Sequence, residues 1–209
     1  MNVLIADDFP LFRRGVIDLL DAGLGSVHIG ECASAYELLE QVRRSKWDVV
    51  ILDVSMPGSS GTETLKQLKK ERPSLPVIVL SMHPEDQYGV RMFKAGADGY
   101  LNKASAPEEL VRAIRKVVAG GHYVSAVLGE KLAVNLKTDS QKPAHELLSD
   151  REYEVLRLMA SGNTVSEIAD TLHLSVTTVS TYRARLLEKM RLKNNAELIR
   201  YGLEYKLTD

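Results

Sequence analysis

Residues 48–54 (DVVILDV) and residues 76–82 (PVIVLSM) are two short runs whose side chains are mostly hydrophobic on both faces. A strand that lies between two layers of helices has this pattern, because both of its faces are buried. We therefore expect these runs at the centre of a parallel β-sheet. Three further runs rich in apolar residues belong to the same sheet, namely residues 2–8 (NVLIADD), 27–33 (VHIGECA) and 98–103 (DGYLNK).

The segments between these runs have apolar residues at helical spacing, as in Leu11, Phe12, Val16 and Leu19. Strands that alternate with helices predict an α/β doubly wound fold with a five-stranded parallel sheet. The last helix of this pattern starts at Ser105 or Ala106, has acidic residues in its first turn and ends at a glycine pair. The first domain is therefore expected to span residues 1–121.

Polar residues end four of the five runs. Asp7 and Asp8 end the first, Asp53 the third, Ser81 the fourth and Lys103 the fifth. The carboxyl ends of parallel strands lie at one edge of the sheet, so these side chains are expected to share one pocket. Carboxylates at close range repel each other unless a cation lies between them, and oxygen ligands suit Mg²⁺. The pattern predicts a Mg²⁺ site.

Each of these residue types has a chemical role in such a pocket. The Asp53 carboxylate can attack phosphorus and form an acyl phosphate, with Asp7, Asp8 and the backbone carbonyl of Ser55 as further metal ligands. An ammonium group at Lys103 can contact phosphoryl oxygens, and a hydroxyl at Ser81 can move toward them. A single aspartate at a strand end more often caps a helix or forms a turn. The complete set of polar strand ends favours a phosphorylation site over helix caps and turns.

The composition limits the other classes of function. The chain has 209 residues, of which 44% are hydrophobic and 26% are charged, and its net charge is -1. It is therefore long enough for two cores, and it is not a polycation that binds nucleic acid over its whole surface. Cys32 is the single cysteine and is expected to be a buried, reduced thiol. Without a leader or an apolar stretch of about 20 residues, the expected location is cytoplasmic, away from membranes.

The rest of the chain changes character after the glycine pair. Residues 122–146 predict a linker with one helix over 125–137, and residues 147–209 predict a second, all-α domain. Ser149 and Glu152 form the sequence pattern of a capping box at its first helix, and Gly162 is expected to end that helix.

Two helices of the second domain are separated by a tight turn at residues 173–175. The second of them, residues 176–190, and the residues just after it contain a basic cluster, which consists of Arg183, Arg185, Lys189, Arg191 and Lys193. Basic residues near a helix C-terminus are favoured by the helix dipole whatever the function. Helix, turn and helix together are more specific, because the second helix of such a pair fits the major groove of DNA.

Residues 1 to about 120 resemble the receiver domain of two-component response regulators. The resemblance assigns Asp7 and Asp8 to the acidic pair, Asp53 to the phosphoacceptor, Ser81 to the switch hydroxyl and Lys103 to the invariant lysine. It implies phosphorylation by a sensor histidine kinase with Mg²⁺.

Three positions of the receiver pattern stay open at this stage. Tyr100 is either the aromatic residue that turns inward with Ser81 or an ordinary half-exposed strand tyrosine. His83 is either a residue that tunes loss of the phosphoryl group or part of a helix start. Ala104 stands where many receivers have a proline after the lysine, so other contacts are expected to aim the ammonium group.

The segment from about Leu147 resembles the LuxR-type DNA-binding domain through Arg151–Glu152, Gly162, Glu167–Ala169 and Thr178–Val179. A receiver followed by this domain is typical of the NarL/FixJ class, and TVSTYRARLLEKM, with Tyr182, is similar to the BvgA and EvgA branch. The resemblance implies DNA contacts, toward bases from small side chains and toward the backbone from basic ones, at Thr178, Ser180, Thr181, Arg183, Ala184, Arg185 and Lys189.

These observations together predict a DNA-binding response regulator that forms a homodimer on phosphorylation and binds promoter DNA at inverted half-sites, with RNA polymerase as a further candidate partner. An aspartyl phosphohydrolase is the first alternative, but such enzymes usually need an acid two residues after the nucleophile, where this chain has Ser55. We therefore expect that the protein is not an enzyme. The second alternative is a DNA-binding factor that is controlled by oligomeric state or a protein partner, with a vestigial acidic pocket.

Overall fold

The computed structural model describes residues 1–56, 60–82, 85–137 and 143–208, so His83 lies outside the described residues. The chain divides into two compact units, Met1–Leu136 and Lys137–Asp209. None of the helices in the described ranges combines the length and the apolar character that crossing a membrane requires.

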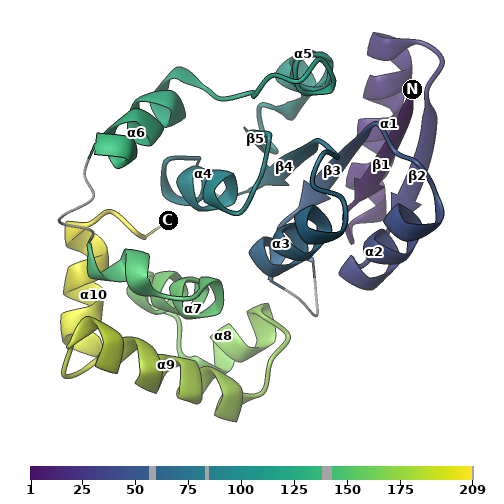
Figure 1. Ribbon diagram of the computed structural model, residues 1–209. Coiled ribbons are helices and arrows are strands. Elements are labelled where there is room, and N and C mark those ends of the chain that lie inside the picture. The colour runs from purple at the N-terminus through teal and green to yellow at the C-terminus, as the bar shows by residue number, and fades with distance from the viewer. Residues whose placement is uncertain (57–59, 83–84, 138–142, 209) are drawn as a thin grey trace. The chain divides into compact units, whose positions relative to one another are not determined.

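The first unit contains a five-stranded parallel sheet in the order β2-β1-β3-β4-β5 (Figure 1). Every residue of β3 and β4 is buried, which agrees with the hydrophobic character of both faces in these two runs. The predicted α/β fold is confirmed. The strands are β1 (Asn2–Ala6), β2 (His28–Cys32), β3 (Val49–Asp53), β4 (Val77–Ser81) and β5 (Gly99–Asn102).

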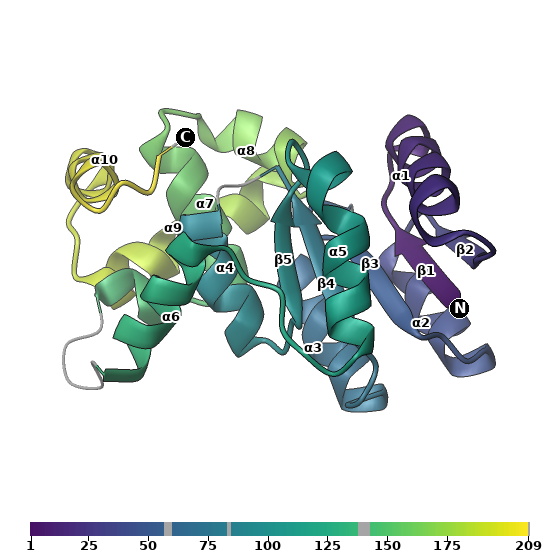
Figure 2. The same cartoon turned by 90° about the horizontal axis from the view of Figure 1, so that it is seen from above.

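Helices cover both faces of this sheet (Figures 1 and 2). On one face, α1 packs against α5, and side chains such as Leu20 and Ile114 fill the core beneath them. On the other face, α2 contacts α3, and α3 contacts α4. The bounds are α1 (Pro10–Leu24), α2 (Ala35–Arg44), α3 (Gly61–Glu71), α4 (Glu85–Lys94) and α5 (Ala106–Val118).

The strand register brings the polar strand ends together. Asp53 pairs with Leu80 across β3 and β4, and Ser81 pairs with Asn102 across β4 and β5. All strands run in the same direction, so the residues that follow their last pairs lie at one edge of the sheet. Asp7, which follows β1, and Lys103, which follows β5, therefore reach the edge that holds Asp53 and Ser81.

The first part of the segment predicted as a linker is packed into the first unit. Tyr123 is buried, forms an isolated bridge with Gly99 and donates its backbone N–H to the carbonyl of Asp98 at 2.8 Å. Helix α6 (Ala126–Lys137) follows it. Leu128 of α6 is fully buried at Gly89 of α4, where an added Cβ would lie 2.7 Å from both Leu128 Cδ atoms.

The second unit is helical and begins with a short 3₁₀ helix. Ser149 and Glu152 form the predicted capping box at α7, and Gly162, with φ of 91°, follows its C-cap. A second capping box, between Thr164 and Glu167, starts α8. The elements are η1 (Ala144–Leu147), α7 (Asp150–Ala160), α8 (Val165–Thr171), α9 (Val176–Met190) and α10 (Asn195–Glu204).

Buried apolar side chains from all four α-helices hold the second unit together, for example Leu156, Ile168, Leu186 and Leu198. The Nδ1 atom of His145 in η1 lies 2.9 Å from the hydroxyl oxygen of Tyr201 in α10. The short 3₁₀ helix is thereby fixed to α10.

We predict that Leu128→Ala loosens α6 from the first unit. Burial of one leucine side chain contributes about 2 kcal/mol, so the amide exchange rates of α6 should rise about 30-fold, as hydrogen exchange with mass spectrometry measures. The neighbouring Val127 is 54% exposed, and Val127→Ala should leave exchange unchanged. Equal protection of α6 in both variants would show that Leu128 does not hold the helix.

Candidate functional site

Three carboxylates gather at the carboxyl edge of the sheet. Asp7, Asp8 and Asp53 each present a carboxylate oxygen, and these oxygens all lie within 4.8 Å of one another. Asp7 and Asp53 are buried, whereas Asp8 is exposed. All of the donors are hard oxygens, so the group fits a small divalent cation such as Mg²⁺.

The two buried carboxylates are held in the same way. Asp7 Oδ1 accepts the backbone N–H of Phe9 at 2.8 Å, and Asp53 Oδ1 accepts the N–H of Ser55 at 3.0 Å. In each case a residue two positions later fixes one carboxylate oxygen, as in an Asx turn. The other oxygen of each group, Oδ2, is left for the site.

Lys103 joins these two oxygens. Its Nζ lies 2.7 Å from Asp7 Oδ2 and 2.8 Å from Asp53 Oδ2. Its side chain is only 10% exposed, so the three charges are largely withdrawn from water. The ammonium group thus compensates two carboxylates that would otherwise repel each other.

Burial and charge act in opposite directions on the pKa values of this group. Burial raises the pKa of the Asp53 carboxyl above its ordinary value, although Lys103 and the Ser55 N–H act in the opposite direction. Burial lowers the pKa of Lys103, but the Asp53 and Asp7 carboxylates more than reverse this, and the net pKa is raised. Lys103 therefore stays charged at neutral pH.

The turn after β5 aims Lys103 without a proline. The backbone N–H of Lys103 donates to the carbonyl of Ser81 at 2.8 Å. Asn102 Oδ1 accepts the N–H of Ala104 at 2.9 Å, and the Asn102 carbonyl accepts the N–H of Ser105 at 3.0 Å. The described residues contain no cis peptide bond. Because Ala104 replaces the usual proline, we expected other contacts to position Lys103. Asn102 and Ser81 provide these contacts.

The remaining predicted residues of the first unit are placed as follows. Ser81 is fully buried at the end of β4. Tyr100 is also fully buried, so the expectation of a half-exposed side chain is wrong, and its role as the switch aromatic residue stays a prediction. Ser55 reaches the site through its N–H, and the metal-ligand role of its carbonyl stays a prediction. Cys32 is buried as expected, and burial raises the pKa of its thiol to about 12.

Three residues that contact this site were not among the predicted site residues. The ring centroid of Phe12 lies 4.5 Å from Lys103 Nζ. Arg13 Nη1 donates to the carbonyl of Asp7 at 2.6 Å, and Asn102 shapes the turn that precedes Ala104. The sequence could have pointed to Phe12 and Arg13, because a helix that starts at residue 10 places its first turn against the edge where the first strand ends.

The second candidate site is the outer face of α9. Ser180, Thr181, Ala184 and Arg185 are all exposed along this helix. Thr178 is partly used within the unit, because its hydroxyl lies 2.8 Å from that of Ser175, which caps α9. Three of these four exposed residues, Ser180, Thr181 and Ala184, are small, as expected for a helix that approaches base edges closely.

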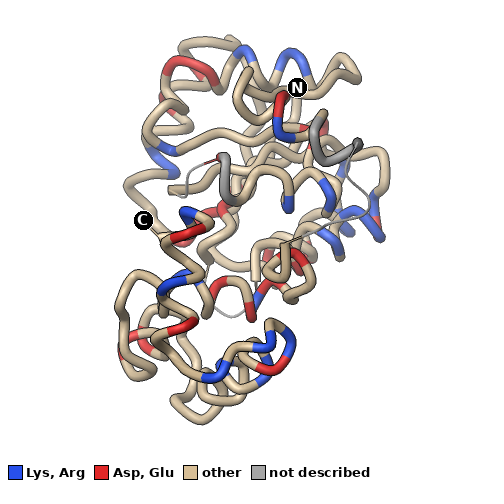
Figure 3. Tube along the Cα trace, turned by 90° about the vertical axis from the view of Figure 1, so that its left-hand side faces the viewer, with Lys and Arg blue, Asp and Glu red and all other residues tan. Residues whose placement is uncertain are grey.

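The other two basic residues predicted at the DNA backbone have partners inside the unit. Arg183 Nε donates to Asn195 Oδ1 at 2.7 Å, which ties α9 to α10. Lys189 Nζ lies 2.7 Å from Glu152 Oε2 and ties α9 to α7. Both residues thus have a structural role, and their contacts with DNA stay predictions. Figure 3 shows that both Lys or Arg and Asp or Glu occur in each of the two units.

Comparison with protein families places both sites in known domains. Residues 3–115 match the response regulator receiver domain, and residues 146–202 match the bacterial regulatory proteins of the luxR family. The two matches cover the acidic site and the helix-turn-helix segment, respectively.

Whole proteins with this arrangement are similar to the chain over nearly its full length. The response regulator UvrY of Escherichia coli K12 is 33% identical over 97% of this chain and 95% of its own, and the response regulator GacA of Pseudomonas aeruginosa is 34% identical over 100% and 98%. Among solved structures, RcsB of Salmonella enterica serovar Typhimurium bound to promoter rprA with BeF₃⁻ has a TM-score of 0.64 at 31% identity, covering 96% of this chain and 98% of RcsB. The resemblance to the BvgA and EvgA branch stays a prediction.

We predict that the ion pair between Glu152 and Lys189 makes the stability of the second unit depend on pH. Burial raises the pKa of Glu152, but hydrogen bonds from Lys189 and Ser149 outweigh it, so the pKa is lowered on folding. The unfolded chain then binds more protons. The stabilisation is complete above the ordinary glutamate pKa of about 4.3 and is lost as pH falls through the lower, folded-state pKa.

Hydrogen exchange of α9 in the full chain at different pH values measures this effect. Glu152→Gln should flatten the acid dependence of α9 protection and lower that protection at neutral pH by about 1–3 kcal/mol. Trp47, the single tryptophan, lies in the first unit, so its fluorescence serves as the control and should not change. An unaltered acid dependence in the variant would contradict the assignment.

Proposed function

The chain belongs to the NarL/FixJ class of response regulators, in which a receiver domain precedes a LuxR-family DNA-binding domain, and we propose that phosphorylation of Asp53 controls its binding to promoter DNA. The observation that supports this most strongly is the pair of salt bridges from Lys103 to Asp7 and Asp53 at the edge of the sheet. These contacts bring the nucleophile Asp53, a cation and a second carboxylate together in one buried corner.

The proposed reaction is transfer of a phosphoryl group from a phosphohistidine of a sensor histidine kinase. Asp53 Oδ2 attacks phosphorus, the bond from phosphorus to the histidine nitrogen breaks, and the imidazole leaves with its electron pair and takes up a proton. Asp53 Oδ1 stays held by the Ser55 N–H, so the carboxylate presents one defined oxygen. The Lys103 ammonium, already 2.8 Å from Asp53 Oδ2, then contacts a phosphoryl oxygen.

Mg²⁺ is proposed as the cofactor. The carboxylates of Asp7, Asp8 and Asp53 would hold it, with the carbonyl of Ser55 as a further ligand. When bound, Mg²⁺ neutralises negative charge on the incoming phosphoryl group and favours the ionised form of Asp53. The exposed carboxylate of Asp8 leaves the site accessible from solvent.

The signal then passes from the acidic corner to the surface of the receiver. Ser81 and Tyr100 are both buried, on adjacent strands, so movement of the Ser81 hydroxyl toward the phosphoryl group changes the packing around Tyr100. Helix α4 contacts β5 and carries the Gly89 surface on which α6 rests. We propose that this route ends in dimerisation of the chain and release of its DNA-binding domain.

The DNA-binding step is assigned to α9. Its exposed Ser180, Thr181 and Ala184 are proposed at base edges in the major groove, and Arg185 at a phosphate. RcsB was solved as two dimers bound to two parallel DNAs, which supports dimeric DNA binding for this chain. The inverted arrangement of the half-sites stays a prediction. Small side chains make few direct base contacts, so DNA shape is proposed to add specificity.

The remaining proposals concern class, location and partners. We propose that the protein is a regulator that becomes phosphorylated and does not turn over phosphoesters. An aspartyl phosphohydrolase usually needs an acid two residues after the nucleophile, and this chain has Ser55 there. Cytoplasmic location and contact with RNA polymerase stay predictions from the sequence. Steady hydrolysis of small phosphoesters by the purified chain would favour the enzyme alternative.

We predict that Asp53→Asn removes the response to phosphorylation. Wild-type protein incubated with acetyl phosphate and Mg²⁺ should form an acyl phosphate, visible as a mobility shift on a phosphate-affinity gel, and should bind duplex DNA more tightly. The variant lacks the nucleophilic carboxylate oxygen and should show neither change. If the variant retained the mobility shift, a residue other than Asp53 would be the phosphorylation site. Tighter DNA binding by both proteins would leave the acidic pocket without a regulatory role.

We also predict that Arg185→Ala weakens DNA binding through the loss of one phosphate contact. The plot of log K against log salt concentration should become shallower by about 0.9 for a mixed-sequence duplex. Arg200→Ala removes the same charge from an exposed position on α10 and serves as the control, with an unchanged slope. Equal slopes for the wild type and both variants would show that Arg185 of α9 does not contact a DNA phosphate.

A further inference from the structure

Among the residues that the structure describes, the Lys103 ammonium group has three neighbours, and one of them is an aromatic ring. Two are the carboxylates of Asp7 and Asp53, at 2.7 and 2.8 Å. The third is the ring face of Phe12, whose centroid lies 4.5 Å from Nζ. This separation is well within the range of a cation–π contact, and the low exposure of Lys103 strengthens it.

The three neighbours respond differently to a divalent cation. Asp7 and Asp53 are also proposed metal ligands, so the oxygens that hold Lys103 are drawn toward the metal when it binds. A cation close by also repels the ammonium group. A phenyl ring has no oxygen ligand to give to Mg²⁺. The contact with Phe12 is therefore one for which the metal does not compete.

We propose that Phe12 is a positioning residue that keeps the Lys103 ammonium at the phosphorylation site while its carboxylate partners bind Mg²⁺. This inference rests on the proposed function and adds a residue to it. Phe12 acts through Lys103 and does not contact the phosphoryl group itself.

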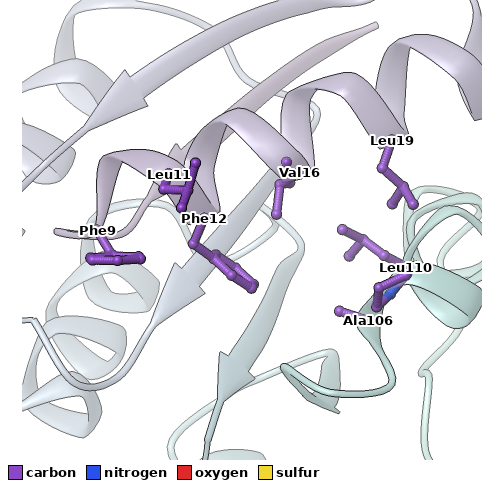
Figure 4. A pocket seen from close by; sticks show the side chains of 9 residues that line it. Phe9, Leu11, Phe12, Val16, Leu19, Ala106 and Leu110 are labelled. Atoms are coloured by element: carbon purple, nitrogen blue, oxygen red, sulfur yellow. The ribbon is translucent and has the colours of Figure 1, made fainter.

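The surroundings of Phe12 suit this role. Figure 4 shows its side chain leaving α1 on the side of a pocket of about 400 Å³ between α1 and α5. Leu110 and Ala106 of α5 line the other side, so the ring has apolar neighbours and is half-buried. The first turn of α1 is fixed to the site, because the backbone N–H of Phe12 donates to the carbonyl of Phe9, whose own N–H donates to Asp7.

Two variants of Phe12 separate the ring from the side-chain bulk. Phe12→Leu keeps an apolar side chain and removes the π face, whereas Phe12→Tyr keeps the face. Leu19→Ala is the matched control, because Leu19 lines the same pocket and, like Phe12, is partly buried against the core. Phe12→Met, of similar length to phenylalanine, replaces Phe12→Leu if that variant does not fold.

The first measurement is the NMR signal of the Lys103 ε-methylene protons in the full chain with Mg²⁺ alone. A ring face at this distance shifts these protons upfield, and the shift should be present in wild type, Phe12→Tyr and Leu19→Ala and absent in Phe12→Leu. The second is the rate of phosphorylation by acetyl phosphate with Mg²⁺. This rate should fall about 3-fold to 10-fold in Phe12→Leu and recover in Phe12→Tyr.

Two results would overturn the proposal. One is a Lys103 signal that does not respond to removal of the ring, and the other is an equal loss of rate in Phe12→Leu and Phe12→Tyr, which indicates packing alone. If wild-type protein accepts no phosphoryl group, the proposed function fails. The NMR signal still decides the role of Phe12 in that case, because it requires only Mg²⁺.

Discussion

The contact of one ammonium group with two buried carboxylates is the constraint on which the acidic site depends. Asp53 ends β3, whereas Asp7 and Lys103 follow β1 and β5, so this contact exists only when three strands have the correct register. Without Lys103, two buried carboxylates at this range would destabilise the sheet edge. With it, the site is stable and still has oxygens of the kind that a divalent cation binds.

The proposed function of this site depends on exchanging that contact for another. In the proposed function, a metal and a phosphoryl group would replace Lys103 as the partner of the carboxylates, and the ammonium group would then need contacts that do not compete with the metal. Asn102 fixes the backbone of the turn, and Phe12 offers its ring. Ser81 and Tyr100 are buried, so we propose that the exchange would change side-chain packing inside the core, close to α4 and to the packed helix α6.

The sequence predicted much of this arrangement, for physical reasons. Short runs that are apolar on both faces and alternate with helical segments favour internal strands, and polar residues at their ends meet because parallel strands share a direction. The sequence did not reveal side-chain contacts between distant segments. The pairing of Lys189 with Glu152, the docking of Leu128 on Gly89 and the ring of Phe12 over Lys103 depend on three-dimensional packing that periodicity does not encode.

A crystal structure of the full chain grown with beryllofluoride and Mg²⁺ tests the central claim most directly. Our account predicts a beryllofluoride group bonded to Asp53 Oδ2 and Mg²⁺ beside it, held by Asp7, Asp8, Asp53 and the carbonyl of Ser55. It also predicts that Lys103 Nζ moves from Asp7 to a fluorine atom. A beryllofluoride-free Asp53, with Lys103 still bridging Asp7 and Asp53 at saturating ligand, would contradict it.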